Sequence, residues 1–326
     1  MGRLALVLAC LTACGSEPPS QTWEVVRQDE TASLLAVWGS SAQDVWVVGG
    51  RTALDGGPTV LRYQDHAWSR VDTGQTTLDL WWAFGVAPDD VFFGGSNGTI
   101  LRFRGGSFEK QTTPPISGVV FGIWGASSND VWAVGDGGAA GAIVWHFDGT
   151  QWTSPALPAG TPSRVFKVHG RASNDVWMSC GDGSMLHWDG ATLERQLTGV
   201  DTPLFSVVTT PDDVVAVGGV LGQGQILEGT GADWQVNAFA SPVAWRGIAG
   251  LGDTVYALGE DGAVAERVDG TWRVVPQPLI QKSFHAGWVD PDGGLWAVGG
   301  EFDRAPLTAR GFITYYGTDT IEEVQP

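Results

Sequence analysis

The sequence predicts an all-β fold: a single seven-bladed β-propeller whose blades are four-stranded antiparallel sheets. Two observations predict it. One phrase returns seven times within 326 residues, and each copy reads as four short strands joined by turns. A spacing of about 40 residues between such copies is typical of propeller blades, and one closed ring of this length needs no second domain. We expect the copies at residues 34–71, 80–110, 121–152, 166–195, 205–236, 245–275 and 284–324.

The strands of each copy have distinct sequence patterns. The first strand is apolar and ends in an aromatic residue followed by glycine, as in Trp38-Gly39 and Trp124-Gly125. A turn rich in Ser, Asn and Asp follows, because these side chains hydrogen-bond to nearby backbone. The second strand pairs valine with an aromatic residue, as in Val45-Trp46, which suits a strand packed on both faces. A third strand and a Gly-containing turn lead to a fourth strand, which in most copies carries Trp68, Phe108, Trp152, Trp234 or Trp272.

Two segments compete to close the ring. Residues 23–26 read WEVV and resemble the fourth-strand sequence WRVV at residues 272–275. Residues 321–324 could fill the same place in the last blade. We favour residues 23–26, because Trp23 matches the tryptophan of the repeat.

The N-terminus has the pattern of a secretory signal. Arg3 precedes a short apolar stretch at residues 4–11, which is too short to span a bilayer as a helix. The sequence LTAC at residues 11–14 resembles a bacterial lipobox, in which Cys14 becomes the lipidated first residue of the mature protein. We expect a signal peptide at 1–13 and a flexible tether at 14–22. The resemblance implies anchoring to the cell envelope, and at the outer membrane, because neither Gly15 nor Ser16 is the Asp that holds such lipoproteins at the inner membrane. The alternative is an ordinary signal peptide with a chance cysteine.

Charge and cysteine content exclude several classes of function. The net charge is −18, with 36 acidic and 18 basic residues, so binding to nucleic acid and electrostatic docking onto anionic lipid are disfavoured. Contact with a membrane is expected through the lipid anchor alone. Cys10 and Cys14 lie in the first fourteen residues, and Cys180 stands alone, so no disulfide framework can form. We interpret Cys180 as a small buried residue rather than a reactive thiol.

The carboxylates and histidines follow the repeat, which argues against catalysis. An Asp recurs at one turn of the copies, and we interpret it as a turn-capping acceptor. His146 and His187 occupy a third-strand position that holds arginine elsewhere, whereas His66 and His285 are unexplained. No HExxH, paired-Cys, GxSxG or nucleotide-binding motif is present, so we predict no enzyme activity. The Asp-Gly loops lack the spacing of an EF-hand, so neither calcium nor another cofactor is expected.

The candidate binding site lies where copies one and seven meet in a closed ring. The loops between the second and third strands and between successive copies are long and varied, and they share one face. Variable loops on a rigid repeat scaffold are common binding sites. The alternative is that they are solvated loops without a function. The candidate ligand-binding residues are Arg51, Asp55, Glu301, Asp303, Arg304 and Arg310.

The phrase at residues 124–152 resembles the Trp-rich repeats of secreted bacterial β-propeller lipoproteins of the kind abundant in myxobacteria. It is more distantly similar to photosystem assembly-factor propellers and to the sialidase-like superfamily, although the sialidase Asp-box is not matched. The resemblance implies the propeller fold and says little about function. We therefore expect, in order, a monomeric non-catalytic platform that binds an envelope or extracellular protein, a glycan-binding propeller, and a hydrolase or lyase with its site in the central channel.

Overall fold

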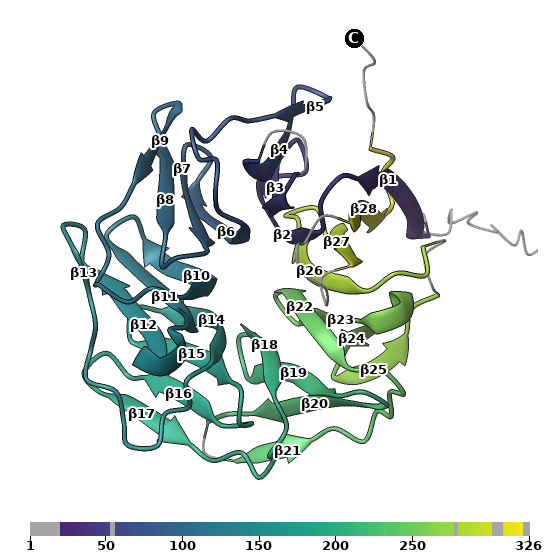
Figure 1. Cartoon of the computed structure of the whole chain (residues 1–326). Helices are drawn as coiled ribbons and strands as arrows, with labels where there is room; N and C mark the ends of the chain where they lie inside the picture. The colour runs from purple at the N-terminus through teal and green to yellow at the C-terminus, as the bar shows by residue number, and fades with distance from the viewer. Residues whose placement is uncertain (1–19, 53–55, 232, 277–279, 302–308, 322–326) are drawn as a thin grey trace, which may run out of the picture.

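The computed structural model is a ring of seven four-stranded antiparallel sheets, which confirms the predicted seven-bladed propeller (Figure 1). It describes residues 20–52, 56–231, 233–276, 280–301 and 309–321. Within these ranges the helical elements are two short 3-10 turns, η1 (Gly138–Ala140) and η2 (Glu260–Gly262). Among the same residues no helix has the length and apolar character needed to cross a membrane.

Blades one to six place their strands in chain order from the axis outward. Blade one consists of β2 (Leu34–Ser41), β3 (Asp44–Arg51), β4 (Pro58–Gln64) and β5 (Ala67–Arg70). Blade two consists of β6 (Leu80–Ala87), β7 (Asp90–Gly95), β8 (Ile100–Arg104) and β9 (Ser107–Lys110). Blade three consists of β10 (Val119–Ser127), β11 (Asp130–Asp136), β12 (Ala142–Phe147) and β13 (Trp152–Thr153). Blade four consists of β14 (Val165–Ala172), β15 (Asp175–Cys180), β16 (Met185–Trp188) and β17 (Leu193–Gln196). Blade five consists of β18 (Leu204–Thr209), β19 (Val214–Val220), β20 (Gln223–Gly229) and β21 (Trp234–Val236). Blade six consists of β22 (Trp245–Leu251), β23 (Thr254–Gly259), β24 (Val264–Val268) and β25 (Thr271–Val274).

The seventh blade joins the two ends of the chain in one sheet. It consists of β26 (Phe284–Val289), β27 (Leu295–Glu301), β28 (Ala309–Gly317) and, as its outer strand, β1 (Thr22–Glu30). Trp23 lies opposite Tyr316 in the antiparallel β1–β28 pair, so residues 23–26 close the ring. The backbone N–H of Ile321 donates to the Glu24 carboxylate, so Ile321 contacts β1 from outside the sheet; residues 322–324 lie beyond the described part of the chain.

The aromatic–glycine pairs of the sequence are contacts between neighbouring blades. The six-membered ring of Trp38 in blade one lies against the backbone of Gly85 in blade two. Trp124 makes the same contact with the glycine of blade four, and Trp288 makes it with the glycine of blade one. The motif therefore places a large ring and the residue without a Cβ on opposite sides of one joint.

In blades one to four the repeated Asp at the start of the second strand binds an arginine or a histidine on the third strand. Arg102 and Asp90 approach to 2.6 Å, and His146 and Asp130 approach to 2.7 Å. In blade two the Arg102 guanidinium also lies over an aromatic ring, 4.6 Å from the centre of Phe92. Equivalent pairs join Asp44 to Arg62 and Asp175 to His187. These carboxylates are therefore structural, as the periodicity of the sequence indicated.

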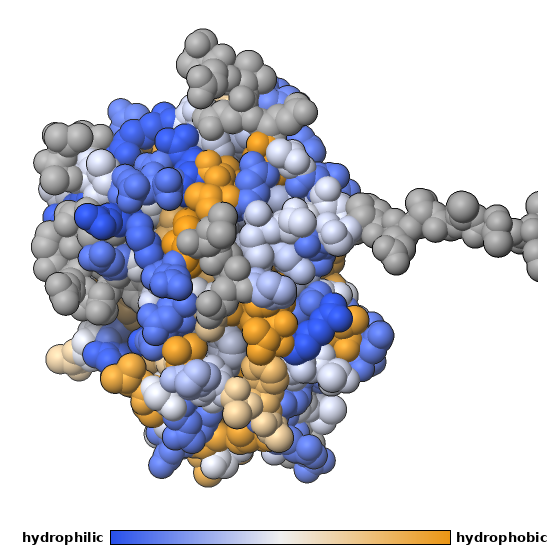
Figure 2. All heavy atoms as spheres, turned by 90° about the vertical axis from the view of Figure 1, so that its right-hand side faces the viewer, coloured by the Kyte–Doolittle hydropathy of each residue, from blue (hydrophilic) through white to orange (hydrophobic). Residues whose placement is uncertain are grey.

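The outer rim is mixed in character. Figure 2 looks onto the side that carries β1, β28 and β25, and apolar side chains reach it in separate clusters between polar ones. Val274 on β25 is an example of an exposed apolar side chain, with 69% of its surface accessible. The described residues of this side thus present no single continuous apolar face.

Candidate functional site

The junction of blades one and seven, the predicted binding site, is organised around Ser33. The Ser33 carbonyl accepts the Gly50 N–H, and the Ser33 hydroxyl donates to the carbonyl of Glu301. The loops that follow β3 and β27 therefore begin from adjacent positions. We call the side of the ring that carries these loops and the connections between blades the long-loop face.

Three of the six predicted residues lie in the described part of the chain. Arg51 has a side chain that is 43% exposed, and its Nε lies 3.3 Å from the Asp79 carboxylate of the connection to blade two. The Arg51 backbone N–H also donates to that carboxylate, over 2.8 Å. Glu301 and Arg310 are exposed on blade seven. Asp55, Asp303 and Arg304 lie outside the described residues. Arg51 is thus held toward blade two and not toward blade seven.

The channel along the axis contains a second candidate site that the sequence analysis did not find. The innermost strand of every blade carries a β-bulge at its second or third residue, where the register with the next strand skips one position. A bulge turns its extra side chain in a new direction. The skipped residues are Leu35, Trp81, Phe121, Phe166, Phe205, Arg246 and His285.

Six of these residues line a cavity of about 180 Å³ at the long-loop end of the channel; we call Trp81, Phe121, Phe166, Phe205, Arg246 and His285 the girdle. The ring centroids of Phe166 lie 5.8 Å from Phe121 and 5.1 Å from Phe205. The Arg246 guanidinium lies 4.5 Å above the Phe205 ring. Aromatic pairs at these separations stabilise one another. The girdle is therefore an ordered, half-exposed apolar surface.

The two basic residues of the girdle, Arg246 and His285, form hydrogen bonds to neighbouring residues. Arg246 Nε donates to the Glu260 carboxylate over 3.0 Å. His285 Nδ1 lies 2.5 Å from the Leu35 carbonyl, to which it donates. Burial and the nearby Lys167 charge lower the pKa of His285 to about 3, so its ring is neutral at pH 7. The girdle thus presents mainly ring faces to a ligand.

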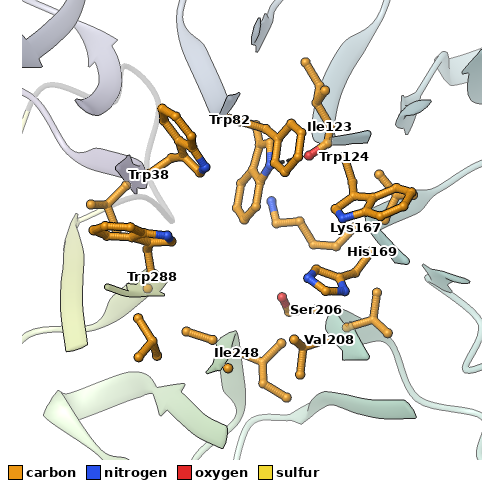
Figure 3. A pocket seen from close by; sticks show the side chains of 18 of the residues that line it. Trp38, Trp82, Ile123, Trp124, Lys167, His169, Ser206, Val208, Ile248 and Trp288 are labelled. Carbon is orange, nitrogen blue, oxygen red and sulfur yellow. Dashed lines mark hydrogen bonds between the residues drawn. The ribbon is translucent and has the colours of Figure 1, made fainter. Parts of the chain in front are cut away.

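Beyond the girdle lies a second cavity of about 240 Å³, the inner chamber, lined by the innermost strands of all seven blades (Figure 3). Trp38, Trp82, Trp124 and Trp288 supply flat apolar walls. Leu251 lines the chamber and is 46% exposed, so the chamber reaches solvent at the face opposite the long loops.

Lys167 lies where the girdle and the inner chamber meet, since it lines both cavities. It is 6% exposed, its Nζ donates to the Phe121 carbonyl over 2.5 Å, and this nitrogen lies 4.0 Å from the centre of the Trp82 ring. The Trp82 indole is itself fixed by an N–H bond of 2.9 Å to the Ile123 carbonyl. Burial lowers the pKa of Lys167 to about 7. No carboxylate occurs among the described residues that line either cavity.

Two further polar side chains lie beside Lys167. His169 Nδ1 accepts the backbone N–H of Thr209 over 3.1 Å, which leaves the ring proton on Nε2. Burial, with a smaller effect of the Arg171 charge, lowers the pKa of His169 to about 4. Ser206 on β18 is 3% exposed and also lines the chamber. Figure 3 shows these three side chains on one side of the chamber and Trp38 and Trp288 on the other.

The chamber had one signal in the sequence. The chain contains three lysines, at 110, 167 and 282, and the second interrupts the apolar first strand VFKVHG of copy four. The other blades place small residues or tryptophan at this position, which made the lysine an exception to the repeat. The bulges had no comparable signal, because the apolar pattern of the strand is the same with or without one.

Comparisons with known proteins show the fold. No family model and no curated protein matches the chain. A streptogramin B lyase structure is similar with a TM-score of 0.69 and 14% identity, over 90% of this chain and 97% of that one. YCF48 bound to a D1 peptide gives 0.68 and 15%, over 91% and 97%, and the WD40 repeats of RRP9 give 0.71 and 10%, over 90% and 97%. The shared feature is the β-propeller, a fold that serves many functions.

Proposed function

We propose that this protein is a non-catalytic binding protein of the bacterial cell envelope, lipid-anchored through Cys14, that binds a segment of a partner protein on its long-loop face. The girdle is the observation that carries the proposal. Phe121, Phe166 and Phe205 are half-exposed at the mouth of the channel and ordered by mutual contact. Clustered aromatic side chains surrounded by polar loops are typical of the centre of a protein interface.

The chemistry of the girdle favours an apolar side chain of a peptide over a sugar. Phenylalanine rings offer no hydrogen-bonding group, whereas a sugar needs donors and acceptors around its hydroxyls. The exposed residues Arg51, Glu301 and Arg310 lie on the same face and would form a polar rim. The similar structure of YCF48 with a D1 peptide supports the idea at the level of the fold, since that propeller binds a peptide.

The inner chamber gives little support to catalysis. Its described ionisable side chains are Lys167 and His169, and both lie on the same wall. General acid–base chemistry needs groups placed on opposite sides of a reacting bond or one group with a suitably placed partner. The streptogramin B lyase is one of the similar structures, and its activity is a property of that protein.

The test uses a soluble form that begins at Ser16, immobilised and exposed to an envelope extract of the source cell. We expect one protein to be retained, and to be lost in a Phe166→Ser, Phe205→Ser double variant. Val274→Ser is the matched control, because it removes an exposed apolar side chain from the outer rim. Arg51→Ala with Arg304→Ala tests, in the same assay, two of the binding residues predicted from the sequence.

Three results would contradict this proposal. Retention that is unchanged in the girdle variant would remove the girdle as the site. Equal loss in the Val274→Ser control would show that the effect is not specific to the channel mouth. Enrichment of polysaccharide without protein would favour the glycan-binding alternative. The anchor is tested separately: Cys14→Ala should abolish labelling by a fatty-acid probe and release the protein from the membrane fraction.

A further inference from the structure

We propose that the inner chamber binds a small organic anion with a flat apolar body, such as an aryl carboxylate, and that Lys167 supplies the counter-charge. This ligand and this cavity differ from the protein partner and the girdle surface of the proposed function. The two proposals can therefore fail independently.

No carboxylate among the described residues that line the girdle cavity or the inner chamber balances the charge of Lys167. Elsewhere in the described structure, buried or half-buried arginines bind carboxylates, as Arg102 does to Asp90 and Arg246 does to Glu260. The chain has twice as many acidic as basic residues, yet within the described structure Lys167 contacts a carbonyl oxygen and an indole face. A buried cation without an anion is unfavourable, so a bound carboxylate would supply the compensation that the chain lacks.

Three hydrogen-bond donors converge on one wall of the inner chamber. An ammonium group has three N–H donors, and one of those of Lys167 is used by the Phe121 carbonyl. His169 carries its ring proton on Nε2, because Nδ1 accepts from Thr209. The Ser206 hydroxyl lies on the same wall (Figure 3). An ammonium, an imidazole N–H and a hydroxyl suit the two oxygens of one carboxylate.

The shape and size of the inner chamber suit a small ligand with a flat apolar body. Trp38 and Trp288 face the polar wall from blades one and seven, and Ile248 adds aliphatic surface (Figure 3). An inorganic anion would leave these apolar walls without a partner. The chamber measures about 240 Å³, below the range of about 300–1,000 Å³ that is usual for drug-sized ligands. These features select one small ring or short chain joined to a single anionic group.

Proton linkage gives this site a signature that a structural lysine would not have. The titratable groups around Lys167 are His169 on its own strand, His285 on β26 and Arg246 on β22. Both histidines are neutral above pH 5 because burial lowers their pKa, and Arg246 is paired with Glu260. A carboxylate beside Lys167 raises the pKa of its amine from about 7, so binding takes up a proton above that pH. Affinity should therefore fall as the pH rises from 7 to about 9.

The experiment uses phenylacetate and its neutral analogue phenylacetamide as probes of the soluble protein. Binding is followed by calorimetry and by tryptophan fluorescence, since four tryptophans line the chamber. We expect phenylacetate to bind at least about tenfold more tightly than the amide at pH 6.5. We also expect proton uptake at pH 8, seen as a binding enthalpy that changes with the ionisation enthalpy of the buffer.

Lys167→Met is the site variant and Lys110→Met is the matched control, because Lys110 is an exposed lysine on the outer strand β9. The first should lose the preference for the acid and the proton uptake, and the second should keep both. Equal binding of acid and amide by the unaltered protein would overturn the proposal without reference to any variant. Absence of saturable binding at millimolar phenylacetate, or an unchanged affinity in Lys167→Met, would also overturn it.

Discussion

The ring of Trp38 occupies the place where a side chain at Gly85 would begin: a Cβ built on Gly85 would lie 2.2 Å from Trp38 Cη2. The same relationship recurs between Trp124 and Gly170, at 2.7 Å. Blade six has a looser version, in which a Cβ on Gly250 would lie 3.3 Å from a methyl group of Val208 in blade five. The aromatic–glycine motif is therefore a joint between blades, and its tightness follows the size of the residue contributed by the preceding blade.

The first prediction concerns this joint. Gly85→Ala should lower the free energy of unfolding by about 2 kcal/mol, because Trp38 must shift out of a packed position. Gly250→Ala is the matched control at the equivalent strand position. It should change the free energy of unfolding by less than about 1 kcal/mol. Urea unfolding followed by fluorescence measures both. Equal effects of the two substitutions would show that the contact with Trp38 does not determine the cost.

The second prediction concerns the ion pair of blade two. Arg102 binds Asp90 through two N–H groups, at 2.6 and 2.7 Å, and both residues are buried. Arg102→Met should therefore lower the free energy of unfolding by about 3 kcal/mol, since it leaves a buried carboxylate without its partner. Arg104→Met is the control, because Arg104 is an exposed residue of the same strand. It should change stability by less than about 0.5 kcal/mol.

The pH dependence of this pair follows from Asp90. Burial alone would raise the pKa of Asp90, but hydrogen bonds from Arg102 and Ser128 outweigh it and lower the pKa. A lowered pKa contributes stability above the pKa of the unfolded carboxyl, about 3.9, which is lost as the pH falls through the folded value. The stability difference between the unaltered protein and Arg102→Met should hence narrow below about pH 4. A difference that stays constant to lower pH would contradict this account.

The sequence predicted the fold well because similar four-strand copies at a regular spacing indicate the blades of a propeller. Seven copies of four short strands, of which the first four match closely in their turns and strand ends, indicate one closed ring, and Trp23 pointed to the strand that closes it. The residues that line the channel were not predicted, because simple alternation along a strand places neighbouring residues on opposite faces. The bulge at Phe166 breaks that alternation, so Phe166 lines the girdle and Lys167 lines both the girdle and the chamber. In blade two the neighbouring residues Trp81 and Trp82 likewise line the channel, Trp81 at the girdle and Trp82 at the inner chamber.

The third prediction concerns Cys180. Its side chain is fully buried, and burial raises the pKa of its thiol to about 12. Because the thiolate is the reactive form, the thiol should not react with a maleimide or an aromatic disulfide at pH 8 in the folded protein. A form that begins at Ser16 contains this single cysteine, so one equivalent should react after unfolding in denaturant. Rapid labelling of the folded form would show that Cys180 is accessible and would revive the interpretation as a reactive thiol.

The fourth prediction is the effect of Lys167 on stability. The pKa of this amine falls from 10.5 in the unfolded chain to about 7 in the folded protein because it is buried. Between these two values the unfolded chain binds more protons at this side chain than the folded protein does. The free energy of unfolding should therefore rise with pH across this window, and the full penalty of burying the charge is present below pH 7.

Lys167→Met removes this penalty while it keeps a side chain of similar length. The variant should be more stable than the unaltered protein at pH 7, by about 3 kcal/mol, because one pKa unit corresponds to about 1.36 kcal/mol and the contacts with Trp82 and Phe121 are partly lost. The advantage should shrink toward pH 10, where the unfolded amine also loses its proton. Lys110→Met should show no such trend, since Lys110 is exposed. An advantage that does not vary with pH would mean that Lys167 keeps an ordinary pKa in the folded protein, and that its ammonium is already well compensated by the carbonyl and the indole.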